Sequence, residues 1–85
     1  MDASPMPQFL LHHEHADHEC GVSFAAWSGF DSPLRHGTAA SSCLSGDRAV
    51  WWRVETRDQQ AALALLPPYV ARRTHVRAVR DVHIP

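Results

Sequence analysis

The 85-residue chain contains no lysine, because all eight of its basic residues are arginines. A lysine imine mechanism is therefore excluded. Two cysteines are too few for a disulfide scaffold. The sequence also has no P-loop or glycine-rich dinucleotide motif, and no apolar run long enough to span a membrane. Its first residues lack the basic and apolar regions of a signal peptide, so we expect a cytoplasmic protein with reduced thiols.

Size and charge narrow the possibilities further. The apolar content of 45% and charged content of 20% are ordinary for one globular domain. A formal net charge of −1 gives no electrostatic basis for binding nucleic acid or an anionic membrane. A chain of this size buries roughly 60–65% of its unfolded surface, so the core of a monomer is marginal. We expect a metal ion, a ligand or a second subunit to add stability.

The start of the chain predicts a leader followed by a strand. Residues 1–7 read as a short flexible leader, and residues 8–85 as a single domain. Residues 8–14 have the pattern of a strand that is covered on both faces. One face carries Phe9, Leu11, His13 and His15, and the other carries Leu10, His12 and Glu14.

A helix is expected next. Asp17 has the side chain of a helix N-cap. Cys20, Phe24 and Trp27 follow at the spacing i, i+4, i+7, which predicts an amphipathic helix of about three turns. Gly29 is expected to close it, and residues 34–37 read as one further turn.

The centre of the chain predicts a hairpin. Residues 38–45 and 49–56 read as two strands, and Gly46 with Asp47 forms the turn signal between them. Trp51 and Trp52 are adjacent on the second of these strands, so their side chains must point to opposite faces of the sheet.

The last third predicts a helix, a further turn and a strand. Asp58 or Thr56 is expected to cap a helix that ends near Leu66, because two prolines follow and cannot lie inside a continuous helix. Pro67 then opens another turn that runs to about Arg73. Residues 76–84 read as the final strand.

These elements predict an α+β domain with the ferredoxin-like order βαββαβ. Helices would cover one face of a four-stranded antiparallel sheet. A tryptophan would then lie on the other face, and large apolar groups on an open sheet face indicate an interface. We therefore expect a homodimer that packs sheet on sheet.

The element order resembles the dimeric α/β-barrel superfamily. Within it, the chain is similar in length and layout to small bacterial ferredoxin-like proteins that bind nickel. The resemblance covers about residues 8–85 and rests on the strand through His12 and His13, the hairpin through Gly46 and the ending Val79 to Ile84. It implies a fold and an assembly, and it transfers no site residue.

Residues 12–20 hold four of the seven histidines and one of the two cysteines. His13 and His15 lie two apart on a strand, with Cα atoms about 6.5–7 Å apart on one face, so both rings can approach one ion. His18 and Cys20 follow close enough to complete the set. Imidazole and thiolate suit zinc, nickel or copper. The predicted metal ligands are His13, His15, His18 and Cys20. His12 would replace His13 if the register of the strand, and so the face on which each side chain lies, differs from this prediction.

Other interpretations stay open for this segment. The histidines fit a solvated strand end, and Cys20 fits a small core residue or a nucleophile whose thiolate is favoured by nearby imidazoles. His36 either approaches the same region or lies on the surface. Cys43 is expected in the core.

Two functions follow. The first is a small transition-metal-binding protein. The second is a dimeric α/β-barrel enzyme of the isomerase or oxygenase type, which would act on a small aromatic or polyketide-like ligand with a histidine as general base.

Overall fold

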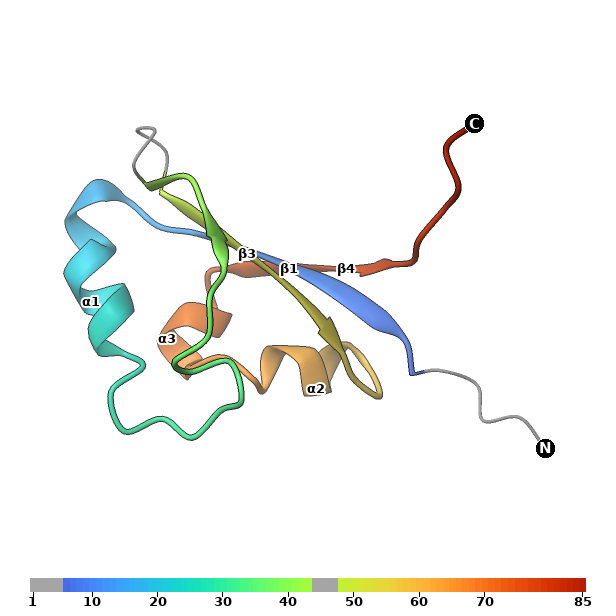
Figure 1. The fold of residues 1–85 in the computed structure, drawn as a ribbon. Helices are drawn as coiled ribbons and strands as arrows, with labels where there is room; N and C mark the ends of the chain where they lie inside the picture. Colours follow the sequence, from blue (N-terminus) through green and yellow to red (C-terminus); the bar gives the residue numbers. More distant parts are fainter. Residues whose placement is uncertain (1–5, 44–47) are drawn as a thin grey trace.

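A computed structural model describes residues 6–43 and 48–85 as an α+β fold with a four-stranded antiparallel sheet and short helices (Figure 1). Residues 1–5 of the predicted leader and the predicted turn at Gly46 and Asp47 lie outside the described residues. The elements are β1 (Gln8–Glu14), a 3₁₀ turn (Asp17–Glu19), α1 (Cys20–Ala25), β2 (Ala40–Ser41), β3 (Ala49–Glu55), α2 (Gln59–Leu63), α3 (Pro68–Ala71) and β4 (Thr74–Val79).

The first strand is the centre of the sheet, whose strand order is β2-β3-β1-β4. Leu11 of β1 is paired with Trp52 of β3 on one side and with Val76 of β4 on the other. The strand therefore has hydrogen-bonded neighbours along both edges. Coverage of both of its faces, expected from the apolar residues on each face, stays a prediction.

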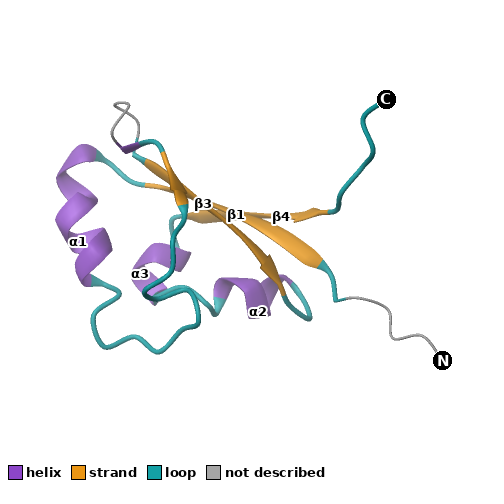
Figure 2. Ribbon diagram, in the orientation of Figure 1, coloured by secondary structure: helices purple, strands orange, loops and turns teal. Residues whose placement is uncertain are grey.

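The helices lie together on one face of the sheet (Figure 2). Between the two layers is the core, formed by side chains that alternate along β1 and β3 together with those of the second and third helices. Leu11 is fully buried. The core residues are Phe9, Leu11, Val54, Ala62, Leu66 and Val70.

The first helix differs from the sequence prediction. Ala16 is the N-cap of the 3₁₀ turn, and Glu19, not Asp17, is the N-cap of α1, which is only six residues long. The backbone N–H of Ala16 donates instead to Oε1 of Glu19 at 2.9 Å. Phe24, predicted on the apolar stripe, is 67% exposed. The predicted stripe is therefore only partly buried, because Trp27 packs against the core and Phe24 does not.

Two strands are shorter than predicted. A strand over residues 38–45 was expected; of its described residues 38–43, only Ala40 and Ser41 are paired with β3, and its last two residues lie outside the described ranges. The final strand begins two residues earlier than predicted and ends at Val79. Val79 is paired with Gln8, the first residue of β1, so the strand stops where its partner begins.

The helix caps in the last third agree with the sequence. Oδ1 of Asp58 accepts the backbone N–H of Ala61 at 2.7 Å, which makes Asp58 the N-cap of α2. Pro67 is the N-cap of the following helix, and Pro68 opens it. None of the described helices is long and apolar enough to cross a membrane.

A candidate functional site at an aromatic pocket

Three of the predicted ligand residues form one hydrogen-bonded chain. Nε2 of His13 lies 3.0 Å from Nδ1 of His15. Nε2 of His15 lies 3.2 Å from Sγ of Cys20. Nδ1 of His13 lies 3.5 Å from Oγ1 of Thr74, whose hydroxyl donates to the carbonyl oxygen of Val70 at 2.7 Å.

The fixed end of this chain determines where the protons lie. The Thr74 hydroxyl uses its proton on Val70, so its oxygen can only accept from Nδ1–H of His13. In neutral His13 the other nitrogen is then an acceptor, and it receives Nδ1–H of His15. Neutral His15 therefore turns an acceptor nitrogen, Nε2, toward the thiol of Cys20.

His13 is held in its neutral form by its surroundings. Its side chain projects from β1 into the protein and is 2% exposed. Burial lowers the pKa of His13 below its ordinary value of 6.5, and the nearby charge of His15 lowers it further. Hydrogen bonds with the backbone of Val70 and Arg73 act in the opposite direction, as acceptors of a ring N–H would. A neutral His13 fits the proton arrangement of the chain.

A carboxylate fixes the turn that presents Cys20. Oε2 of Glu19 accepts the hydroxyl of Tyr69 at 2.7 Å and Nε of Arg73 at 3.0 Å. The guanidinium of Arg73 also stacks on the Tyr69 ring, 3.8 Å from its centroid. The backbone N–H of Ala16, then Tyr69 and Arg73, lower the pKa of Glu19 to about 2. The residue before Cys20 is thus tied to α3.

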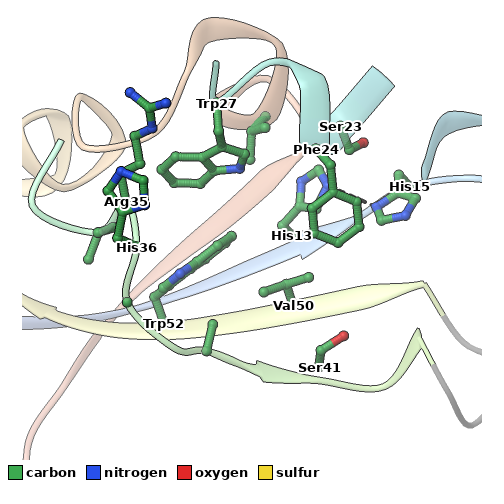
Figure 3. Close-up of a pocket in the computed structure, with 14 residues that line it drawn as sticks. His13, His15, Ser23, Phe24, Trp27, Arg35, His36, Ser41, Val50 and Trp52 are labelled. Atoms are coloured by element: carbon green, nitrogen blue, oxygen red, sulfur yellow. Dashed lines mark hydrogen bonds between the residues drawn. The ribbon is translucent and has the colours of Figure 1, made fainter. Parts of the chain in front are cut away.

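His13 and His15 also line a pocket of about 300 Å³ between the sheet and the first helix. Cys20 is half-buried and is not among the lining residues. It is therefore the member of the hydrogen-bonded chain that lies away from the pocket. The rings of Trp27 and Trp52 form the middle of the pocket, with centroids 5.8 Å apart (Figure 3). The walls are mostly apolar, as in pockets for small organic ligands. The lining residues are His13, His15, Ser23, Phe24, Trp27, Leu34, Arg35, His36, Gly37, Ala39, Ser41, Val50, Trp52 and Val70.

One polar atom of the pocket wall has no partner within residues 6–43 and 48–85. Ser23 is 5% exposed, and its Oγ makes no hydrogen bond there. A buried hydroxyl without a partner costs about 1–3 kcal/mol of stability. The oxygen itself has almost no accessible surface, so the pocket wall leaves it covered.

The turn after α1 carries two basic side chains at the far end of the pocket. Figure 3 shows Arg35 and His36 at one end and His13 and His15 at the other. His36 has a φ of 68°, in the left-handed region that costs a residue with a β-carbon about 1–2 kcal/mol. From the sequence, His36 was expected either near this region or on the surface, because a loop histidine before a glycine has no distinctive pattern.

The other predicted ligands lie elsewhere. His12 points to the opposite sheet face, where its ring is stacked on Trp51 at 5.1 Å and near His75. His18 is exposed and takes part in none of the hydrogen bonds described above. As expected, the two adjacent tryptophans face opposite ways, since Trp52 contacts Trp27 and Trp51 contacts His12. Cys43 is half-buried, beside the edge strand β2 and outside the core cluster.

In the described part of the chain, no group of three or more His, Cys, Asp or Glu side chains is arranged to hold a metal ion. The hydrogen-bonded chain gives a reason. His15 uses Nδ1 toward His13 and Nε2 toward Cys20, on opposite sides of its ring. One ion cannot take both neighbours while the ring keeps this orientation.

No family model, curated protein or solved structure matches this sequence or fold.

Proposed function

We propose that the protein is a small enzyme that moves a proton on an aromatic ligand, with the pair of His15 and Cys20 as its acid–base group. The observation that carries the proposal is the chain Thr74, His13, His15, Cys20 beside the aromatic pocket. His15 gives or takes the proton at Nε2 after its ring turns from Cys20 toward the pocket that it lines, and Cys20 is its proton partner in the resting pair. His13 is the positioning residue, because it holds Nδ1–H of His15 and leaves Nε2 as the acceptor.

Two states of this pair differ by one proton position. In the first state, neutral His15 accepts the thiol proton of Cys20. In the second, the proton is on Nε2 of His15, and the imidazolium faces the thiolate at 3.2 Å. Both states keep the hydrogen bond from His15 to His13. The pair therefore stores a proton beside the pocket without a change in net charge, which suits isomerisation of a bound ligand.

The wider assembly is part of the same proposal. The strand order β2-β3-β1-β4 with helices on one face supports a ferredoxin-like arrangement. Trp51, Leu10 and His12 on the open face support a homodimer through the sheet. The two free cysteines support a cytoplasmic location.

Solvent deuterium exchange tests the enzymatic proposal. Small aromatic carbonyl acids such as phenylpyruvate are incubated with the protein in D₂O, and loss of the proton next to the carbonyl is followed by NMR. We expect the wild type to accelerate exchange and His15→Ala to lose about 10²-fold or more of the acceleration. His75→Ala, on the opposite face, is the matched control. Exchange that is equal in the wild type and His15→Ala would contradict the proposal.

A transition-metal site is the second candidate, and one distance favours it. Nε2 of His13 and Nδ1 of His15 are 3.0 Å apart, close to the roughly 3.3 Å between two nitrogens on a tetrahedral zinc ion. Zinc, nickel or copper would bind if the proton of neutral His15 moved from Nδ1 to Nε2, which leaves Nδ1 as a ligand atom. Cys20 would join the same ion only after the His15 ring turned.

Metal analysis of untagged protein separates the two candidates. A metal site predicts near-stoichiometric zinc, nickel or copper that is lost in both His13→Ala and Cys20→Ala. His12→Ala and His75→Ala are controls on the opposite face. Protein that stays metal-free after dialysis against each ion would exclude this candidate and leave the acid–base proposal standing.

A further inference from the structure

The end of the pocket opposite the His13–His15 pair is positively charged. Arg35 and His36 line it, and no carboxylate is among the described lining residues. We infer that the ligand is an aromatic carboxylate whose anionic group binds Arg35 and His36. This inference names the substrate class for the proposed acid–base site and rests on that proposal.

Arg35 is available for such a contact. It makes no ion pair with any residue in the described ranges 6–43 and 48–85. Two other arginines already have carboxylate partners: Arg73 pairs with Glu19, and Arg53 pairs with Asp81. A guanidinium binds a carboxylate through two parallel N–H···O bonds, which fits a planar acid.

Hydrogen bonds fix the backbone of the turn that carries these two residues. Oγ of Ser32 donates to the carbonyl oxygen of Leu65 at 2.6 Å and accepts the backbone N–H of Leu34 at 3.2 Å. The Leu34 side chain packs against the core, and its carbonyl oxygen accepts the N–H of Gly37 at 3.3 Å. The left-handed backbone of His36 lies within this fixed turn, as conformations of this kind do at ligand sites.

The rest of the pocket defines the other parts of the ligand. Trp27 and Trp52 lie between the cationic end and the histidines, where they would contact an aromatic ring (Figure 3). His13 and His15 line the end beyond the tryptophans. The pocket thus fits a carboxylate followed by an aromatic ring.

Calorimetric titration with benzoate and with benzamide tests the inference. The two molecules have nearly the same shape and differ in charge. We expect benzoate to bind at least about tenfold more tightly than benzamide, and Arg35→Gln to remove this preference. Arg77→Gln is the matched control, since Arg77 lies on the opposite face of the sheet. His36→Gly relieves the left-handed backbone of His36, and we expect it to weaken benzoate binding while leaving thermal stability unchanged or higher.

The outcomes distinguish the inference from the proposal beneath it. Equal binding of benzoate and benzamide, with both lost in Trp52→Ala, overturns the anion preference and leaves the pocket of the proposed enzyme in place. Loss of the preference in Arg77→Gln as well as in Arg35→Gln also overturns it. If neither benzoate nor benzamide binds, both the inference and the proposed function are contradicted.

Discussion

His15 turns Nε2 toward Sγ of Cys20 at 3.2 Å, and the opposite nitrogen of its ring is held by a second, buried histidine. The imidazole of His15 therefore connects the thiol of Cys20 to neutral His13, and His13 fixes the tautomer of His15. This relationship is local in sequence, because His15 and Cys20 are only five positions apart. It depends on the end of β1 and on the turn that leads into α1.

Alkylation of Cys20 should depend on His15. In a Cys43→Ser background only one thiol remains, so iodoacetamide reports on Cys20 alone. We expect His15→Ala to slow the reaction by about tenfold or more at pH 7, because the proton acceptor for the thiol is lost. His18→Ala is the control, since His18 is exposed. Equal rates in the two variants would show that Cys20 reacts independently of the chain.

Burial of His13 should make stability fall in mildly acidic solution. In the unfolded chain its ring takes up a proton near pH 6.5, whereas the pKa in the folded protein is lower. Below pH 6.5 the unfolded state therefore binds more protons, and the free energy of unfolding decreases as the pH falls. Urea denaturation between pH 7.5 and 5.5 measures this slope. His13→Gln should flatten it, and an unchanged slope in that variant would mean that another group is responsible.

The hydrogen bond from Tyr69 to Glu19 should be visible in the titration of the carboxylate. We expect Tyr69→Phe to raise the pKa of Glu19 from about 2 toward 4.5, because one donor to the charged form is removed. Carbon-13 NMR of the Glu19 carboxyl measures this. In the wild type the lowered pKa stabilises the fold above pH 4.5, and that contribution is lost as the pH falls toward 2. A pKa of Glu19 that is the same in both proteins would contradict the contact.

The strand register can be checked by two neighbouring leucines. Leu11 is fully buried and Leu10 lies half-buried on the opposite face. We expect Leu11→Ala to lower the free energy of unfolding by about 2–5 kcal/mol and Leu10→Ala to lower it less. Urea denaturation of the two variants gives both values. The reverse order would mean that β1 is shifted by one residue, which also exchanges the faces of His12 and His13.

Two strands of the sheet could be predicted from short apolar and alternating runs. The apolar run from Phe9 to Leu11 predicted a strand over Gln8–Glu14, and the strand has those bounds. Asp58 and Pro67 act through local backbone chemistry, so the helix start and the break were also predictable. The length of β2 was not, because it depends on how far its partner β3 extends alongside it.

The site was only partly predictable for similar reasons. Two-residue spacing placed His13 and His15 on one face, and they are in contact. The role of Thr74 was hidden, since it is 61 residues from His13 and meets it only through the pairing of β1 with β4. Arg35 and His36 reach the pocket because Ser32 ties their turn to Leu65, and no local pattern indicates such a contact.

Nitrogen-15 NMR of the histidine rings tests the central claim most directly. At pH 7.5 the chain predicts that His13 and His15 are each present as one tautomer with the proton on Nδ1, and that Cys20→Ser changes the Nε2 shift of His15 more than that of His13. His75, on the opposite face, should show the usual average of two tautomers. A proton on Nε2 of neutral His15, or averaged tautomers for both rings, would contradict the hydrogen-bonded chain.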